Sequence, residues 1–566
     1  MSNDFLGLDR SGNDNNWTVN NMTLAADQVV DSPTNNFATL NPLNEDTEAL
    51  AEGSLQIKSR VGGSGNGFAK STMAFSSGKW YAEYLWVSGG NGGMPGISPT
   101  TASMSDGTGK YYAGASGKKY SISGTSYTDD GSYGSGWSVG DIIGVAMDAD
   151  ANTLTFYKNN SSMGTAYSSL TDEYYFSNAT LGGPENIGVW NFGQDSSFAG
   201  NKTAQGNQDG NSIGDFYYTP PTGFLALCTK NLPDVAVTPS KHFNTVLYTG
   251  NGSTQSITGF GFQPDWIWDK SRNQVNSHML VDAVRGVGKY LRTNLANAEV
   301  DDASVLTSFD SDGVTVGDIN GNATSSSSVM WGWKANGSGS SNTDGSSNST
   351  VSANTDAGFS IVSYTGQSGA QTIGHGLSKT PEMIILKNRS DADEWLVYYG
   401  YKDNYLRLDT NAAEGDNTFW NDTAPTPSVF SVGDSRPSNS GHGSNYIAYC
   451  FHSVDGYSKA DGFYIGNAST DGVFNYCGFS PKWIMIKRKN AVNNWYIYDT
   501  ARTANNPNGT VLLADSSNAE ATQTYFQIDI LSNGWKARAS DGAINTSGEY
   551  IYLAFAETPF KYSNAR

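Results

Sequence analysis

The chain is poor in the residues from which metal and catalytic centres are built. Its 566 residues include five histidines, and only 16% of all residues are charged. No H-x-x-x-H or E-x-x-H spacing, which zinc and diiron sites use, occurs at His242, His278, His375, His442 or His452. A Gly-x-Ser-x-Gly elbow and a phosphate-binding P-loop are also missing. The sequence therefore predicts that the protein is not an enzyme and binds neither a metal ion nor a cofactor.

Cysteine is equally scarce, which bears on the compartment where the chain folds. Cys228, Cys450 and Cys477 cannot all pair. Two of them lie inside apolar strand-like runs, where a thiol behaves as a small hydrophobic group. We therefore expect no structural disulfide, which is consistent with assembly in a reducing cytosol.

The sequence also lacks a basic balance and a long apolar run. Its formal net charge of −20 argues against nucleic acid as a partner, because phosphates demand a basic patch. No apolar run approaches the roughly 18 residues of a membrane span. Residues 1–20 lack the basic start and apolar core of an export signal. We expect neither nucleic-acid binding nor membrane insertion, and we attribute the acidity to solubility.

Glycine and aromatic residues are abundant. The chain has 65 glycines and 12% aromatic residues, and its polar surface must rest on Ser, Thr, Asn and Gly. This profile predicts an all-β protein in which many turns join short strands. The length allows about three to five domains.

Residues 1–47 are predicted to form an extended N-terminal arm. They contain turn-forming strings such as Asp31-Ser-Pro33-Thr-Asn-Asn36 and few apolar anchors. A flexible tail would have a similar composition. The apolar residues Phe5, Leu8, Trp17 and Leu24 favour an arm that docks on another surface.

From residue 48 to residue 233 the sequence alternates regularly. Period-two runs such as Trp80-Tyr-Ala-Glu-Tyr-Leu-Trp86 are broken by Gly, Asn and Asp turns, which predicts an antiparallel β-sandwich. This region resembles the SPRY domain, a concanavalin-like sandwich. Residues that match its motifs are Gly78, Lys79, Tyr81, Glu83, Gly140, Asp141, Ile143, Gly144, Asp148, Leu154, Phe156, Tyr157 and Asn159. The resemblance implies a domain that binds partners through loops at one end of the sandwich.

A short string returns three times in the second half of the chain. It reads Pro264-Asp-Trp266-Ile267-Trp-Asp-Lys270, Pro381-Glu-Met383-Ile384-Ile-Leu-Lys387 and Pro481-Lys-Trp483-Ile484-Met-Ile-Lys487. An Ala-Glu pair and then an apolar run follow each copy at similar spacing. A repeat of roughly 100 to 120 residues suits a duplicated β module better than a solenoid unit.

We therefore predict three small β modules after the sandwich, at residues 234–354, 355–457 and 458–566. A short helix is expected near residues 297–301, 411–415 and 518–521. Residues 338–354 are rich in Gly, Ser, Asn and Thr and are expected to form a linker or long loop.

The recurrent charges and one tyrosine-rich segment are the candidate sites. We predict structural ion pairs between the lysine and the glutamate of each module, namely Lys270–Glu299, Lys387–Glu414 and Lys487–Glu520. A candidate ligand surface, rich in the Tyr, Ser and Gly of adaptable binding loops, contains Tyr111, Tyr112, Tyr120, Tyr127 and Tyr133. Tyrosines that merely lie on strands of the sandwich are an equally good interpretation. Asp310-Ser-Asp312-Gly313 and Asp148-Ala-Asp150-Ala-Asn152 lack the terminal Glu of a calcium loop and are interpreted as turns.

The whole layout, an arm, a SPRY-like domain and a threefold lysine-ending repeat, resembles virion proteins of tailed phages from aquatic bacteria. The resemblance implies a tail fibre or spike component, exposed on the particle after assembly in the host cytoplasm, that adheres to a host glycan or protein. Its arm would bind other virion proteins, and a homotrimer would supply avidity. The alternatives are a capsid decoration or head-fibre protein and, third, a host polysaccharide depolymerase, which would need two carboxylates about 5 to 9 Å apart in a cleft.

Overall fold

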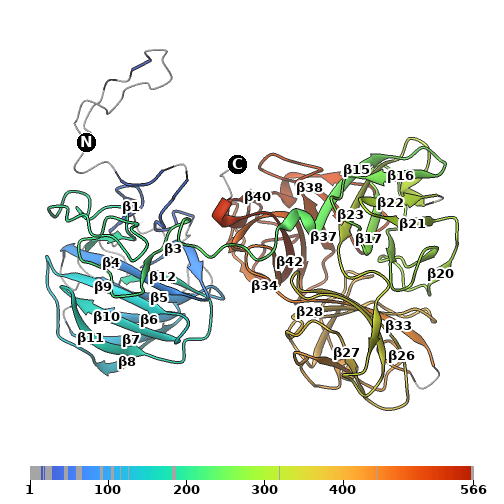
Figure 1. Ribbon diagram of the computed structural model, residues 1–566, viewed down its shortest axis with the longest axis horizontal. Coiled ribbons are helices and arrows are strands. Elements are labelled where there is room, and N and C mark those ends of the chain that lie inside the picture. Colours follow the sequence, from blue (N-terminus) through green and yellow to red (C-terminus); the bar gives the residue numbers. More distant parts are fainter. Residues whose placement is uncertain are drawn as a thin grey trace. The chain divides into compact units, whose positions relative to one another are not determined.

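The computed structural model (Figure 1) describes residues 15, 16, 18, 29–32, 34–43, 49–58, 67–89, 93–102, 107–114, 116–124, 126–180, 186–317, 319–440 and 443–562. The chain divides into two compact units, residues 1–233 and 234–566. Regular structure in the described residues consists of β strands and a few 3-10 turns, which confirms the predicted all-β class. Across these residues, no helix is long and apolar enough to cross a membrane.

The first unit is a sandwich of two sheets. One sheet has the order β1-β2-β13-β4-β9-β10-β11, with β14 parallel to β4, and the other has the order β3-β12-β5-β6-β7-β8. The strands of the first sheet are β1 (Ala49–Ala51), β2 (Gln56–Lys58), β4 (Lys79–Ser88), β9 (Ile142–Asp148), β10 (Thr153–Lys158), β11 (Ser161–Tyr167), β13 (Ile187–Asn191) and β14 (Leu225–Ala226). The strands of the second are β3 (Gly67–Phe75), β5 (Met94–Pro99), β6 (Gly109–Ala113), β7 (Lys118–Ser123), β8 (Ser126–Ser132) and β12 (Tyr174–Thr180). Aromatic pairs such as Phe176–Trp190 and Tyr112–Phe156, with ring centroids 6.3 and 5.3 Å apart, pack between the sheets.

Local turn chemistry fixes the register of the sandwich. Asn159 and Asn160 join β10 to β11 with φ values of 46° and 69°. Asparagine tolerates this left-handed conformation, which a two-residue hairpin turn requires at both positions. The Asn residue of the SPRY-like motif therefore has a defined structural role.

The described end of the predicted arm packs on the same unit. Phe37, Ala38 and Leu40 are buried, and the Ala38 N–H donates to the Leu227 carbonyl at 2.9 Å. The anchors expected at Phe5, Leu8, Trp17 and Leu24 lie outside the described residues.

The second unit contains three main sheets that share one strand order. It is β15-β23-β17-β18 in the first, β26-β33-β28-β29 in the second and β34-β42-β36-β37 in the third. The first main sheet comprises β15 (Phe243–Thr249), β17 (Trp266–Ser271), β18 (Met279–Asp282) and β23 (Ser327–Trp333). The second comprises β24 (Ser340–Asn342), β25 (Ser349–Asn354), β26 (Phe359–Thr365), β28 (Met383–Asn388), β29 (Leu396–Tyr398), β30 (Asn404–Arg407), β31 (Gly415–Asp416) and β33 (Asn445–Phe451). The third comprises β34 (Ser458–Gly466), β36 (Phe479–Arg488), β37 (Trp495–Asp499), β38 (Thr510–Leu513), β39 (Ala521–Thr522) and β42 (Gly548–Pro559).

A small sheet accompanies each main sheet. The small sheets are β16 (Gln255–Thr258), β22 (Gly313–Val316) and β21 (Leu306–Asp310); β27 (Gln371–Gly374) and β32 (Val429–Val432); and β35 (Phe474–Tyr476), β41 (Gly534–Ala537) and β40 (Ile528–Leu531). The remaining elements are the pair β19 (Lys289–Tyr290) and β20 (Val300–Asp301) and the 3-10 turns η2 (Pro239–Lys241), η3 (Asn320–Asn322), η4 (Thr418–Trp420), η5 (Thr524–Phe526) and η6 (Phe560–Tyr562). We call each main sheet with its small sheet a body: the first spans residues 243–333, the second 340–451 and the third 458–559.

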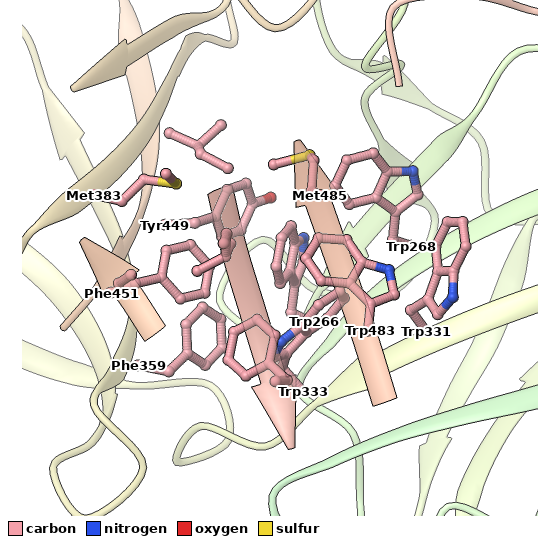
Figure 2. Close-up of a cluster of buried hydrophobic side chains, with 14 of the residues drawn as sticks. Trp266, Trp268, Trp331, Trp333, Phe359, Met383, Tyr449, Phe451, Trp483 and Met485 are labelled. Carbon is pink, nitrogen blue, oxygen red and sulfur yellow. The ribbon is translucent and has the colours of Figure 1, made fainter. Parts of the chain in front are cut away.

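Alternation along the lysine strands directs side chains into two different cores. Ile267, Ile384 and Ile484 each lie in the separate core of their own body. The intervening side chains, Trp266, Trp268, Met383, Ile385, Trp483 and Met485, all lie in one cluster that draws on the three bodies. Figure 2 shows this central core, in which indole and phenyl rings from the three main sheets pack together.

Aromatic contacts join every pair of bodies in the central core. They include Trp266–Tyr449 at 4.4 Å, Trp333–Trp483 at 5.6 Å and Phe451–Phe555 at 6.0 Å between ring centroids. Each such ring buries a large apolar area, so contacts between the bodies supply a large part of the hydrophobic stabilisation of the second unit.

Two local expectations for the second unit are wrong. The segments 297–301, 411–415 and 518–521 form no helix; they are extended loops that lead into β20, β31 and β39. Residues 338–354 are not a linker, because β24 and β25 pair with each other and β25 pairs with β26. The second main sheet therefore begins at Ser340, inside the range predicted for the first module.

Replacing Trp266 with alanine should lower the free energy of unfolding of the second unit by about 3–5 kcal/mol, because it opens a cavity in the central core. Urea unfolding followed by tryptophan fluorescence measures the change. The control is Val275→Ala, at a side chain that is 70% exposed, which should change the free energy by less than about 0.5 kcal/mol. Equal small effects for both variants would contradict a shared core.

Candidate functional site

The three recurrent lysines are buried and donate to backbone carbonyls. The acceptors are Ser271, Gln274 and Ser517 for Lys270, Asn388 and Asp391 for Lys387, and Asn411 and Asn493 for Lys487. Ser517 and Asn411 belong to a different body from the lysine that they bind. Burial lowers the pKa of each of the three ammonium groups to about 8. The three lysines therefore hold loop carbonyls in place, in their own body for all three and in a neighbouring body for Lys270 and Lys487.

Two of the recurrent glutamates form bidentate pairs with an arginine of another body. Glu299 of the first body binds the Arg389 guanidinium of the second, with both N–O distances 2.9 Å. Glu520 of the third body binds Arg272 of the first in the same way, at 2.9 and 2.8 Å. Parallel N–H···O bonds of this kind fix orientation as well as charge.

The third glutamate makes a looser contact of the same kind. Glu414 of the second body lies 3.8 Å from the Lys489 ammonium of the third. Its carboxylate also accepts hydrogen bonds from the hydroxyl of Tyr399 and the amide of Asn404. Lys489 binds Glu549 more closely, at 2.6 Å.

A backbone hydrogen bond accompanies all three contacts. The glutamate N–H donates to the carbonyl of the cationic residue, Glu299 to Arg389 at 2.8 Å, Glu414 to Lys489 at 2.7 Å and Glu520 to Arg272 at 2.7 Å. We call these the three junctions. The first joins bodies one and two, the second joins two and three, and the third joins three and one, so the contacts close on themselves.

The predicted ion pairs therefore have the wrong partners. Lys270, Lys387 and Lys487 do not pair with Glu299, Glu414 and Glu520 of their own modules, because the lysines bind carbonyls and the glutamates reach into the next body. The cation that the glutamate needs stands two residues after each lysine, at Arg272, Arg389 and Lys489. That recurrence is visible in the sequence and is the signal that the spacing argument missed.

The described histidines serve packing and hydrogen bonding. His278 accepts from the Trp268 indole at 2.8 Å, so its other ring nitrogen donates to the Leu513 carbonyl of the third body, also at 2.8 Å. Burial lowers its pKa to about 3. His375 and His452 bond the carbonyls of Thr426 and Ser453, and His242 bonds the side-chain amide of Asn354. His442 lies outside the described residues.

Most of the tyrosines proposed as a ligand surface are interior. Tyr111 and Tyr112 are fully buried, and Tyr133 is nearly so. Tyr111 bonds Ser177, and Tyr112 donates to the Ser135 carbonyl. Tyr120 and Tyr127, on β7 and β8, pack partly against the core. Tyr111, Tyr112, Tyr120 and Tyr127 therefore lie on strands, as the alternative interpretation has it, and Tyr133 directly follows β8. The three buried tyrosines are not part of an exposed ligand surface.

The acidic strings interpreted as turns behave as turns. Asp312 accepts from the backbone N–H groups of Gly259 and Gly261, and Asp148 binds Lys79 and the N–H of Ala151. Among the described residues, no group of three or more His, Cys, Asp or Glu side chains is placed to hold a metal ion. Cys228, Cys450 and Cys477 are free thiols in buried positions.

Two fully buried carboxyl groups have raised pKa values. Glu83 accepts from the N–H groups of Tyr217 and Tyr218 at 2.9 and 2.8 Å. Asp269, in the core of the first body, accepts from the Tyr248 hydroxyl at 2.6 Å. Burial raises the pKa of each to about 7, since the charged form loses more hydration than its hydrogen bonds return. Both groups serve the interior of the fold.

The second junction carries an exposed apolar surface. Tyr401, Phe463 and Ile465 are 50%, 38% and 53% exposed. The Lys489 ammonium contacts both rings, at 4.6 Å from the centroid of Tyr401 and 5.8 Å from that of Phe463. We call these four residues the junction patch. Such groups are more often found inside a protein or at an interface than in water.

The other two junctions have smaller side chains at the positions of Phe463 and Ile465. In the third body, Phe463 pairs with Ile551 on the middle strand, and Ile551 pairs on its other side with the recurrent lysine Lys487. The residues that pair in the same way with the middle strand opposite the recurrent lysine are Ser363 in the second body and Leu247 in the first. Thr365 and Thr249 likewise stand where the third body has Ile465. The junction therefore forms twice in this chain without an aromatic residue at the position of Phe463, so Phe463 and Ile465 are not required for closure.

Two family models match the chain. One is described as "Domain of unknown function (DUF7483)" and matches residues 238–559, and the other is the SPRY domain, which matches residues 88–195. The first unit therefore contains a SPRY-like domain. No curated protein matches the sequence.

Solved structures similar to this chain correspond to about a quarter of it. The SPRY domain of human HERC1 is 18% identical, with a TM-score of 0.20, and the match covers 28% of this chain and 95% of that one. The carbohydrate binding module CBM66 from Bacillus subtilis is 16% identical, with a TM-score of 0.21, and the match covers 27% of this chain and 91% of that one.

Replacing Glu299 with alanine should destabilise the second unit by about 2–4 kcal/mol, because the guanidinium of Arg389 and the buried one of Arg285 both lose a carboxylate. Chemical denaturation measures the loss. Asp403→Ala is the matched control, since Asp403 pairs with Lys402 in solvent and should contribute less than about 1 kcal/mol. If Glu299→Ala lowers the free energy of unfolding by no more than the control does, the junction does not contribute to the stability of the second unit.

Asp269 should make stability depend on pH. Its folded pKa of about 7 lies above the unfolded value of about 3.9, so the folded state takes up a proton as pH falls through 7. Relative to Asp269→Asn, the wild type should gain about 1.4 kcal/mol per pH unit between roughly pH 7 and pH 4 and lose that gain as pH rises through 7. Paired denaturation curves at pH 5 and pH 8 measure the difference, and a difference that is independent of pH would exclude a raised pKa.

Proposed function

This chain belongs to the DUF7483 family, and we propose that its family region and its SPRY-like domain form a component of a tail fibre or spike of a tailed phage, which adheres to the host cell surface. The resemblance of the layout to virion proteins supports this assignment. We infer further that the three bodies are copies of one module, which their common strand order, lysine register and junctions support.

The junction patch is the observation that carries the adhesion function. Exposed apolar surface is unfavourable in water, and the same fold is completed at two other junctions with smaller or polar side chains there. Tyrosine and phenylalanine supply large rigid contact areas at a small entropic cost, which is why such residues anchor binding surfaces. A ligand that covers the patch would remove these apolar side chains from water, which is why we assign the patch a binding role.

The scaffold suits a binding surface that must keep its shape. Tyr401 comes from the second body, whereas Phe463 and Lys489 come from the third. The two bodies are joined there by the hydrogen bond from the Glu414 N–H to the Lys489 carbonyl, which is 2.7 Å long. A patch assembled on a rigid frame loses little entropy when it binds. A host glycan or a host protein presents apolar and polar groups that fit such a surface.

The threefold arrangement lies within one chain. Each junction glutamate binds a cation of the same polypeptide, so the closure leaves no junction open for a second copy. A homotrimer of this chain would therefore use other surfaces. Light scattering on the purified protein distinguishes a monomer from a trimer, and copy number in purified virions distinguishes the tail position from the alternative of capsid decoration.

The double substitution Phe463→Ser/Ile465→Thr should reduce binding to host cells by at least about tenfold, because it removes apolar contact worth roughly 1.4 kcal/mol or more. It installs the residues that the second body has at these positions, so folding should be preserved. Labelled protein bound to cells of the host, and its competition with phage adsorption, are the measurements.

Leu247→Ser is the matched control, because it removes exposed apolar surface at the same register of the first body. It should leave cell binding unchanged. Equal binding by the wild type, the double variant and the control would reject the junction patch, and a wild-type protein that neither binds cells nor competes with the phage would reject adhesion.

A further inference from the structure

The third body carries a polar hollow beside its small sheet. The hollow has a volume of about 570 Å³, and the residues that line it include Asp471, Asn506, Gln527, Asp529 and Arg538. This volume lies within the range of about 300–1,000 Å³ that small-molecule sites have. Most of its lining groups can donate or accept hydrogen bonds.

The charges in and under the hollow balance one another. Arg538 Nε lies 3.3 Å from Asp529, and Arg538 Nη1 lies 3.6 Å from Asp471. Lys536, whose side chain is buried, places its ammonium 3.2 Å from the same Asp471. Two cations therefore compensate two carboxylates, and the hollow has no formal net charge.

One wall of the hollow is rigid and another offers open hydrogen-bonding groups. The Asn506 side chain is held in place by the backbone of Ile530, since its amide donates to the Ile530 carbonyl at 2.7 Å and accepts from the Ile530 N–H at 2.8 Å. The Gln527 side chain makes no hydrogen bond to any residue that the structure describes. Its donor and its acceptor are therefore both available to a ligand.

The other two bodies lack this set of charges. Lys536 and Arg538 lie on and just after β41, and their equivalents by strand register are Thr315 and Gly317 in the first body and Ser431 and Gly433 in the second. Asp529, which opposes Lys536, corresponds to Ser308. The small sheet thus forms twice without these charges, so folding does not explain them.

We propose that this hollow binds a neutral saccharide. Carboxylate, guanidinium and amide groups side by side match the alternating donors and acceptors of sugar hydroxyls, and their zero net charge favours a neutral ligand. An anion would need an excess of positive charge and a metal ion an excess of carboxylates. The inference rests on the proposed adhesion function for its biological meaning, since it names the kind of host molecule recognised.

The test is binding of the full-length protein to an array of neutral oligosaccharides with sulfated and carboxylated ones as anionic probes, followed by calorimetry with the strongest neutral binder. The variant is Asp529→Ser/Arg538→Gly, which installs residues of the first body and removes one charge of each sign. It should weaken binding at least tenfold. Lys118→Ser/Asp129→Ser, an exposed ion pair of the SPRY-like domain, is the control and should leave binding unchanged.

The proposal is overturned if no neutral oligosaccharide binds, if only anionic probes bind, or if the variant binds as the wild type does. Host-cell binding separates this result from the proposed function. If the variant no longer binds the oligosaccharide but still attaches to cells, the hollow does not take part in adhesion, and the proposed adhesion function stands. A wild type that binds oligosaccharide but not cells supports the site and contradicts adhesion.

Discussion

The structure of the second unit depends on the closure of three bodies around one central core. Each body has its own core behind its main sheet, and the side chains on the other face of the lysine strand complete their packing against the other two bodies. Burial of these rings drives the association. The junctions fix which bodies become neighbours, because each glutamate donates its N–H to a carbonyl of the next body and its carboxylate lies beside a cation of that body. Loss of any one body would expose the central core, so we expect the three bodies to fold and close in one cooperative step.

Much of this fold could be predicted from the sequence, and the reason is local. Period-two alternation and Asn-Gly-rich turns are short-range signals, so the all-β class and the SPRY-like sandwich follow from them. The recurrent lysines could be found for the same reason. Their partners could not, since Glu299 and Arg389 are 90 residues apart, and Arg272 and Glu520 are 248 apart. Spacing within one module contains no information about which neighbour closes on it.

The candidate sites could not be predicted correctly either, because the contacts that form or bury them join residues far apart in the sequence. Composition indicated a tyrosine-rich binding segment, yet Tyr111 and Tyr112 are both interior, because both faces of β6 are covered. Tyr112 packs against Phe156 of the opposite sheet, and Tyr111 lies in a separate cluster with Phe68 and Met94. The junction patch was missed because Tyr401 and Phe463 come from different bodies and reach the same lysine, Lys489, only after closure. Comparison of equivalent positions within the chain separates what the fold requires from what it does not.

Hydrogen exchange of residues 234–562, followed by mass spectrometry across a urea series, tests the closure most directly. Peptides of all three lysine strands, β17, β28 and β36, should lose protection at one common urea concentration, because no body keeps its buried face without the others. If the peptides of one body exchange at clearly lower urea while those of the other two stay protected, the bodies are independent domains and the central core is not the constraint that organises this protein.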